Sequence, residues 1–164
     1  MIRLATEADI KPIMMIVKKT IAMMQAENNL QWDETYPSYE VFENDIRRNE
    51  LYVFEADMEV LGFICISPET DDEYATIEWA SKQRATVIHR CAVSTKSRSQ
   101  GIASQLFAFA EQKAVTTSQG YLKSDTYVTN EKMRAFFAKK DYDFKGIMKR
   151  PELPFEFYCY DKQL

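Results

Sequence analysis

Residues 94–103 combine a polar loop, one glycine and the start of a helical pattern. Seven polar residues follow the apolar run 87–93, and Gly101, one of only four glycines in the chain, comes directly after them. The first N–H groups of a helix lack partners within the helix and attract anions. Glycine lets a phosphate approach the backbone, and Arg98 can add a charged contact while the small Ala103 keeps the approach open. The pattern R-x-x-G-x-A therefore predicts a pyrophosphate-binding loop, with a helix start that merely uses glycine as the alternative.

Two other phosphate-binding motifs do not fit this loop. A nucleotide P-loop needs a Lys-Ser/Thr pair after its last glycine, and this loop has none. The dinucleotide fingerprint needs three glycines where this loop has one.

The three cysteines, Cys65, Cys91 and Cys159, do not form a metal-binding or redox pattern. They are widely spaced, no CxxC pair occurs, and the chain has a single histidine. Each lies in an apolar, strand-like run, which favours buried structural thiols over a reactive nucleophile. We therefore expect no metal site and no nucleophilic cysteine.

Composition excludes several classes of protein. The chain has 164 residues, enough for one domain with a sizeable core, and 46% of them are hydrophobic. A net charge of -4 without a basic block argues against nucleic acid as a partner. No apolar run reaches the ~20 residues of a membrane span, and no signal peptide is visible, so we expect a cytoplasmic protein.

Hydrophobic periodicity predicts a mixed α/β domain with one central sheet. Thr6 to Asp9 is a capping signal, Asp57 and Met58 form a hairpin turn, and the polar, acidic connection 67–83 has some helix around Trp79. The expected strands are 2–4, 51–56, 59–66, 86–93, 121–128, 144–148 and 155–160; the expected helices are 10–24, 38–49, 101–117 and one opened by Asn130.

The run IHRCAVSTKSRSQGIASQLF resembles the acetyl-coenzyme A segment of the GCN5-related N-acetyltransferases (GNAT family). Its signature, (Gln/Arg)-x-x-Gly-x-(Gly/Ala), is matched by Arg98, Gly101 and Ala103. DTYVTNEKMRAFFAKKDYDF resembles the family's strand, asparagine and following helix, and the order of elements agrees along nearly the whole chain. The resemblance implies a single N-acetyltransferase domain over 1–164, with helices on both faces of a mixed sheet and splayed central strands.

The resemblance also implies how acetyl-coenzyme A, the co-substrate, is held. The backbone of Cys91, Ala92 and Val93 would hold the pantetheine arm and polarise the thioester carbonyl. The side chains of Asn130 and Phe137 would contact the pantetheine, although Asn130 also suits a helix N-cap. The N–H groups of the loop and helix start would hold the pyrophosphate; these residues are Arg98, Ser99, Gln100, Gly101, Ile102 and Ala103.

Acetylating an amine requires a base, because an amine like that of lysine has a pKa of ~10.4. His89 is the candidate on the strand, where it shares a face with Cys91, and a hydrogen-bonded structural role is its alternative. Glu78, or an acidic residue of the 69–73 cluster (Glu69, Asp71, Asp72, Glu73), is the other candidate base, although such a cluster is usually only a solvated loop.

The chain departs from the family pattern at Phe137, where the family usually has a tyrosine that protonates the leaving thiolate. A phenyl ring cannot donate a proton, and Asp141 replaces the usual glycine of the same segment. Trp32 and Tyr36 lie in the loop that commonly borders the acceptor site, so they either wall the acceptor or cap the core. The resemblance thus predicts transfer of an acetyl group to a primary amine, of a small molecule or a peptide N-terminus, by direct attack, with a homodimer allowed. A non-catalytic acyl-coenzyme A binding module and a plain interaction domain are the alternatives.

Overall fold

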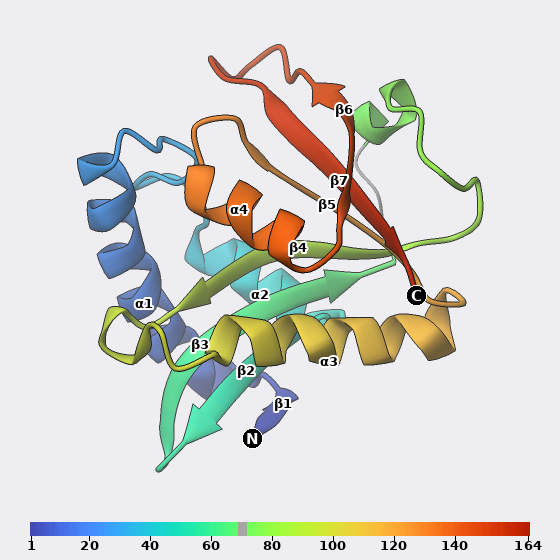
Figure 1. The fold of residues 1–164 in the computed structure, drawn as a ribbon. Helices are drawn as coiled ribbons and strands as arrows, with labels where there is room; N and C mark the ends of the chain where they lie inside the picture. Colours follow the sequence, from blue (N-terminus) through green and yellow to red (C-terminus); the bar gives the residue numbers. More distant parts are fainter. Residues whose placement is uncertain (69–71) are drawn as a thin grey trace. The chain divides into compact units, whose positions relative to one another are not determined.

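The computed structural model describes residues 1–68 and 72–164. In chain order, the elements are β1 (Ile2–Leu4), α1 (Glu7–Ala26), α2 (Tyr39–Arg47), β2 (Leu51–Ala56), β3 (Glu59–Ser67), the 3-10 helix η1 (Asp72–Thr76), β4 (Thr86–Val93), the 3-10 helix η2 (Thr95–Ser97), α3 (Ile102–Thr117), β5 (Tyr121–Tyr127), α4 (Glu131–Lys139), β6 (Asp143–Met148) and β7 (Phe157–Gln163) (Figure 1). This order confirms the predicted mixed α/β architecture.

The strands form one seven-stranded mixed sheet in the order β1-β2-β3-β4-β5-β7-β6. The chain divides into two compact units, of which the first comprises Met1–Ile66 and His89–Ala110 and the second Ser67–Ile88 and Glu111–Leu164. Strand β4 and helix α3 each pass from one unit to the other along the chain.

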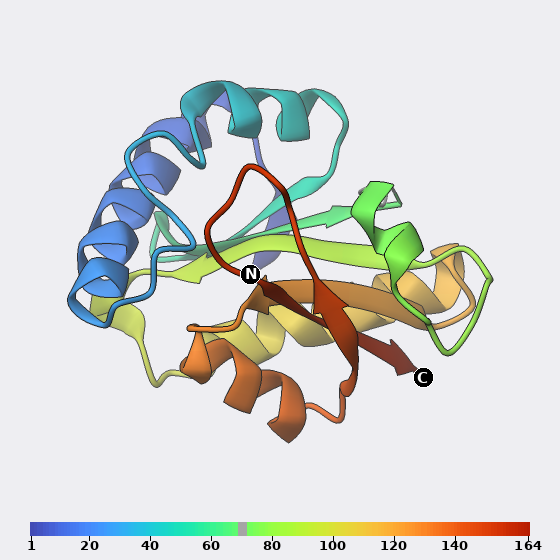
Figure 2. The same cartoon turned by 90° about the horizontal axis from the view of Figure 1, so that it is seen from above.

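The β2–β3 hairpin of the first unit has helices on both faces. Its antiparallel register pairs Leu51 with Cys65 and Val53 with Phe63. These four side chains belong to a buried cluster with apolar residues of α1 and α2. Figure 2 shows both helices on the same side of the hairpin. On the opposite face, the ring of Tyr52 lies 5.0 Å from that of Phe109 on α3. The hairpin therefore positions three helices at once.

Gly62 brings the start of α3 close to β3. A Cβ atom at this position would lie 3.1 Å from the Ala92 carbonyl oxygen and 3.2 Å from Ile102 Cγ2. Any larger residue would push away the strand or the first turn of the helix. This glycine thus fixes the place of the predicted phosphate-binding turn within the first unit.

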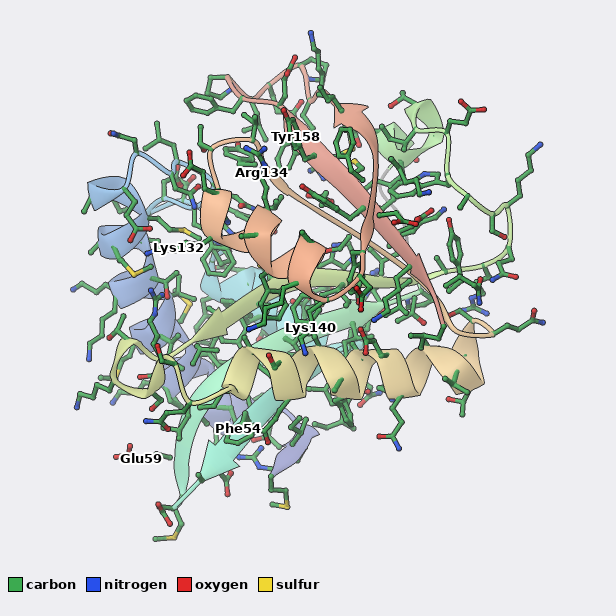
Figure 3. All side chains as sticks on the ribbon, viewed as in Figure 1. Phe54, Glu59, Lys132, Arg134, Lys140 and Tyr158 are labelled. Atoms are coloured by element: carbon green, nitrogen blue, oxygen red, sulfur yellow. The ribbon has the colours of Figure 1, made fainter. Side chains whose placement is uncertain are left out.

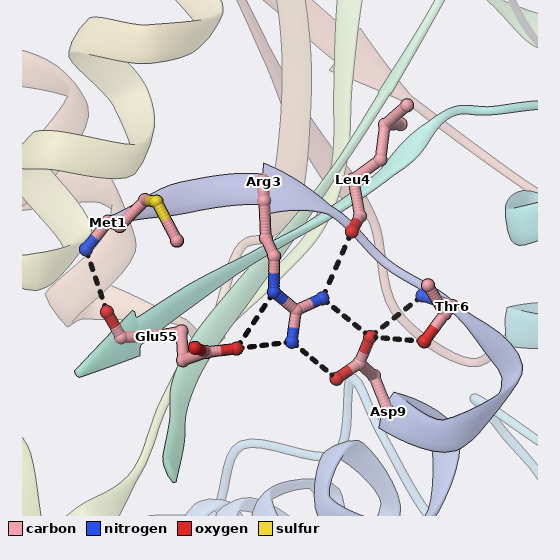
Figure 4. A network of polar contacts seen from close by, with 6 residues as sticks. All are labelled: Met1, Arg3, Leu4, Thr6, Asp9 and Glu55. Atoms are coloured by element: carbon pink, nitrogen blue, oxygen red, sulfur yellow. Dashed lines mark hydrogen bonds and ion pairs between the residues drawn. The ribbon is translucent and has the colours of Figure 1, made fainter. Parts of the chain in front are cut away.

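An Arg3 network fastens β1 to its neighbours (Figure 4). The Arg3 guanidinium donates to both carboxylate oxygens of Asp9, at 2.8 and 2.9 Å, and its Nε donates to Glu55 at 2.8 Å. Asp9 also accepts a 2.7 Å bond from the Thr6 backbone N–H, which is part of the capping box that the sequence predicted. The start of α1 and strand β2 are therefore tied to β1 by one guanidinium group.

The second unit is built on β5, β7 and β6. Parallel pairing joins Thr86–Ile88 of β4 to Leu122–Ser124 of β5, and β7 pairs antiparallel with β5 and with β6. Helix α4 packs its buried Phe137 on Tyr160 of β7. The Arg134 guanidinium of α4 lies 4.6 Å from the ring of Tyr158, and Figure 3 shows these two labelled side chains next to each other. The predicted splaying of β4 from β5 stays a prediction.

One predicted helical segment is misplaced. Helix was expected around Trp79, but the 3-10 helix η1 ends at Thr76. The Trp79 side chain folds back instead, because its Nε1 donates to the Tyr74 carbonyl oxygen at 2.8 Å and its ring lies 5.0 Å from that of Tyr74. Of the acidic residues predicted in this connection, Glu69 and Asp71 lie outside the described residues.

None of the helices in the described part of the chain has the length and apolar character needed to cross a membrane.

Candidate functional site

The predicted phosphate-binding loop is a tight turn between β4 and α3. The Ser94 N–H donates to the Leu61 carbonyl oxygen at 2.7 Å, which anchors the loop to β3. Ser99 and Gly101 both adopt positive φ, 63° and 76°, and α3 begins at the next residue, Ile102. The first-turn N–H groups of α3 lack partners within the helix, and the helix dipole favours an anion there. The turn therefore has the geometry of an anion-binding loop.

Gly101 leaves open space in this turn. Among the described residues, no atom beyond Gly101 and its two chain neighbours lies within 4 Å of the place that a Cβ would occupy, and Gly101 is exposed. Ile102 is buried at 2% exposure, so it anchors the helix start in the core. A ligand can therefore reach the Gly101 backbone without displacing a side chain.

The Arg98 side chain contacts helix α1. Its Nη1 donates to the Met23 sulfur in the last turns of α1. The predicted contact between Arg98 and a pyrophosphate stays a prediction.

The end of β4 carries a partly buried histidine and cysteine. His89, Cys91 and Val93 are partly buried, whereas Ala92 is buried among the residues that pack on α1. Burial raises the pKa of the Cys91 thiol to about 12. Burial also raises the pKa of the Cys65 thiol to about 12, with nearby Arg90 opposing the rise. Both thiols are therefore protonated at neutral pH and are poor nucleophiles.

The second unit holds three of the predicted site residues. Asn130 caps α4, its Oδ1 accepting a 3.2 Å bond from the Met133 N–H. Phe137 is fully buried, with its ring 5.3 Å from that of Tyr142 and 4.6 Å from that of Tyr160. Glu78 is exposed.

A family model for the acetyltransferase (GNAT) family matches residues 20–143. The chain belongs to the GNAT family. This match and the seven-stranded sheet confirm the family and the fold class that the sequence motifs predicted.

Individual GNAT relatives are distant in sequence. The uncharacterized N-acetyltransferase YesJ of Bacillus subtilis is 19% identical over 146 residues, covering 87% of this chain and 81% of its own. A GNAT acetyltransferase structure from Streptococcus agalactiae matches with a TM-score of 0.86 at 23% identity, over 100% of this chain and 95% of its own. The protein yncA of Salmonella typhimurium, solved with its cofactor acetyl-CoA, matches with a TM-score of 0.68 at 12% identity, over 100% of this chain and 93% of its own. These structural matches show the shared fold.

The two aromatic residues of the α1–α2 loop, Trp32 and Tyr36, differ in burial. Trp32 is 4% exposed and stacks on Phe63, with ring centroids 6.3 Å apart, so it packs in the core. Tyr36 is 40% exposed. The packing of Trp32 is what the core-capping alternative expected, whereas Tyr36 is exposed.

The sequence analysis did not predict a buried ion pair that lies beside Tyr36 of the α1–α2 loop. Arg90 on β4 holds Asp45 of α2 at 2.8 Å, with only 15% and 5% of the two side chains exposed. An arginine inside the run VIHRCAV was the available signal, because a buried cation needs a partner. The partner itself lies 45 residues away and could not be identified from spacing.

The second unit also carries a groove of about 630 Å³. None of the predicted site residues lines it. Its lining residues come from α4, β6, β7 and the α4–β6 turn: Glu131, Arg134, Ala135, Ala138, Tyr142, Phe144, Tyr158 and Tyr160.

Proposed function

We propose that this GNAT chain is an N-acetyltransferase that transfers the acetyl group of acetyl-CoA to a primary amine by direct attack in a ternary complex. The observation that carries the proposal is the turn at Ser99–Gly101, which offers first-turn N–H groups of α3 beside open space. Together with membership of a family that uses acetyl-CoA, this turn supports pyrophosphate binding by residues 98–103.

The remaining cofactor contacts follow the family resemblance. The backbone groups of Cys91, Ala92 and Val93 would hold the pantetheine arm, and Asn130 and Phe137 would contact it as well. When bound, acetyl-CoA supplies the activated acetyl thioester. We place one N-acetyltransferase domain over residues 1–164 and its activity in the cytoplasm.

The state of the thiols favours direct attack over an acyl-enzyme. A cysteine nucleophile works as a thiolate, and the raised pKa values of Cys65 and Cys91, about 12 each, keep both protonated. Since Cys159 is buried as well, we expect the amine to attack the thioester itself after losing its proton. His89 is our first candidate for the group that takes this proton, and Glu78 is the second.

Phe137 is the feature that favours a second candidate function. It replaces the family's usual general acid and is fully buried against two tyrosine rings. Loss of a general acid costs ~10²–10⁴ in rate, but a thiol of pKa ~8.5 can still leave as thiolate. A non-catalytic acyl-CoA binding module is therefore the competing function.

A turnover assay separates the two functions. The purified chain is mixed with acetyl-CoA and a panel of primary amines, and both thiol release and the mass of the acetylated amine are followed. We expect amine-dependent thiol release together with the acetylated product. Binding of acetyl-CoA in isothermal titration without any turnover would identify the binding module, and absence of binding would reject both functions.

A further inference from the structure

All N–H groups on the Nε and Nη2 side of the Arg90 guanidinium donate hydrogen bonds. Nε and Nη2 donate to the Asp45 carboxylate at 2.8–3.1 Å, and Nη2 also donates to Cys65 Sγ at 3.3 Å. Burial raises the pKa of the Asp45 carboxyl while the facing guanidinium opposes that rise. A bidentate pair of this kind fixes the plane of the guanidinium.

The outer edge of Arg90 faces Tyr36. Nη1 donates to the Tyr36 hydroxyl oxygen at 3.0 Å, and Tyr36 is 40% exposed. A guanidinium has five N–H donors, so one N–H of Nη1 has no acceptor among the described residues. The Tyr36 hydroxyl accepts from Arg90 and keeps its own proton to donate, again without an acceptor in the described part of the chain. Two hydrogen-bond donors, one on each residue, therefore lie beside an exposed hydrogen bond that joins the two side chains.

The charge around these donors is not positive. Asp45 offsets the charge of Arg90, and ligand atoms of Asp45, Glu50 and Cys65 lie within 4.8 Å of one another, so a second carboxylate is close. The charge of Arg48 also acts on Asp45, so two cations and two carboxylates balance here. With these charges balanced, no net positive charge remains to pair with a carboxylate ligand, whereas a neutral carbonyl oxygen accepts the two hydrogen bonds and needs no pairing charge. The chemistry of the pair thus fits a neutral oxygen.

We propose that the Tyr36 hydroxyl and Arg90 Nη1 bind a neutral carbonyl oxygen of the acceptor, so that the acceptor class is an amine that carries an amide, as an amino-acid amide or a peptide N-terminus does. This inference rests on the proposed N-acetyltransferase function. Arg90 is both a donor to that oxygen and, through its bond to Tyr36, the group that positions the second donor. Asp45 acts only by holding Arg90.

The test removes one donor and compares matched amines. Initial rates are measured for alaninamide, alanine and isopropylamine, which differ in having an amide, a carboxylate or no oxygen. Tyr36→Phe should lower kcat/KM for alaninamide about three- to tenfold, mainly through KM, and change that for isopropylamine by less than about twofold. Comparing variant with parent for each amine cancels the different basicity of the amines.

The matched control is Tyr39→Phe. Tyr39 is another exposed tyrosine of the first unit, at 49% exposure, in the first turn of α2. The kcat/KM of Tyr39→Phe should equal that of the parent for all three amines. Arg90 itself is left intact, because its removal would leave the buried Asp45 carboxylate unpaired and destabilise the fold.

Three results would overturn the inference. An equal loss for all three amines would mean that Tyr36 shapes the loop and binds no oxygen. No loss for alaninamide would remove the hydroxyl from acceptor binding. A larger loss for alanine than for alaninamide would show that the site takes a carboxylate.

A binding measurement separates this inference from the proposed function. Isothermal titration with N-acetylalaninamide needs no turnover, and Tyr36→Phe should bind it about three- to tenfold more weakly than Tyr39→Phe does. If the parent acetylates no amine and this difference persists, the proposed function fails while the oxygen site stands. If the parent acetylates amines and the two variants bind equally, the oxygen site fails while the function stands.

Discussion

Gly101 combines a φ of 76° with open space where a side chain would begin. Gly101→Ala places a methyl group in that space, so we expect the affinity for CoA in isothermal titration to fall at least tenfold. Alanine at positive φ should also lower the free energy of unfolding by about 1–2 kcal/mol, measured by urea denaturation.

A second glycine provides the control for backbone strain. Gly120 has a φ of 79°, and a Cβ there would lie 3.1 Å from Leu164 Cβ, so Gly120→Ala should destabilise the chain at least as much. Its affinity for CoA should stay at the parent value. Equal losses of affinity in the two variants would mean that strain, and not a blocked approach to the backbone, weakens binding.

Phe137 tests whether the missing general acid limits the reaction. Phe137→Tyr adds one hydroxyl at a fully buried position, and a buried hydroxyl without a partner costs ~1–3 kcal/mol. If that hydroxyl reaches the CoA sulfur, the rate should rise up to ~10² below pH 8, and the gain should shrink at higher pH as the thiolate leaves more easily. Thermal unfolding with and without CoA should then show larger stabilisation by CoA in the variant than in the parent. A destabilised variant with neither change would show that Phe137 serves packing alone.

At the scale of elements, the Arg3 network makes the attachment of β1 depend on pH (Figure 4). The hydrogen bonds from Arg3 are the largest cause that lowers the pKa of Asp9 below its ordinary value; the bonds from Thr6 lower it further, whereas burial opposes them. Because the folded-state pKa is depressed, this stability is present above about pH 4 and is lost as the pH falls through the folded value. We therefore expect Asp9→Asn to lower the free energy of unfolding by about 1–2 kcal/mol at pH 7 and by progressively less below pH 4.

The control for this pH dependence is Glu7→Gln, at an exposed acidic residue in the same first turn of α1. Glu7→Gln should change the free energy of unfolding by less than about 0.5 kcal/mol both at pH 7 and below pH 4, as surface substitutions usually do. A deficit in Asp9→Asn that stays constant down to pH 3 would assign the effect to lost packing or capping and not to the ion pair.

Elements defined by local rules were predictable from the sequence. The capping box at Thr6, the hairpin turn at Asp57 and Met58 and the apolar face of α3 depend on neighbouring residues, and each is present in the structure. Features that depend on distant partners were not predictable. The position of β7 between β5 and β6 and the Arg90–Asp45 pair join residues far apart in the chain, and periodicity carries no information on such pairing.

The features of the candidate site also fall into those set by neighbouring residues and those set by distant partners. The turn at Gly101 was predictable, because a helix start after a polar loop is encoded by adjacent residues. The burial of Trp32 and the contact of Arg98 with Met23 were not, because both depend on how α1 and its following loop pack on the first unit.

At the scale of the whole molecule, binding of CoA should raise the stability of the chain. A ligand that binds only the folded state adds ~2.7 kcal/mol when present at 100 times its dissociation constant. For a chain of this length, such a gain corresponds to a rise in Tm of roughly 5–10 °C. Differential scanning fluorimetry with CoA, and with pantetheine as a control that lacks the pyrophosphate, measures this shift.

The pattern of shifts distinguishes the possible functions of the fold. A pyrophosphate-binding turn predicts a large shift with CoA, a small one with pantetheine at the same concentration, and a reduced CoA shift in Gly101→Ala. A plain interaction domain predicts no shift with either ligand, and that result would remove both the enzyme and the acyl-CoA binding module. Because an enzyme and a binding module give the same thermal shift, the amine-dependent release of thiol then decides between them.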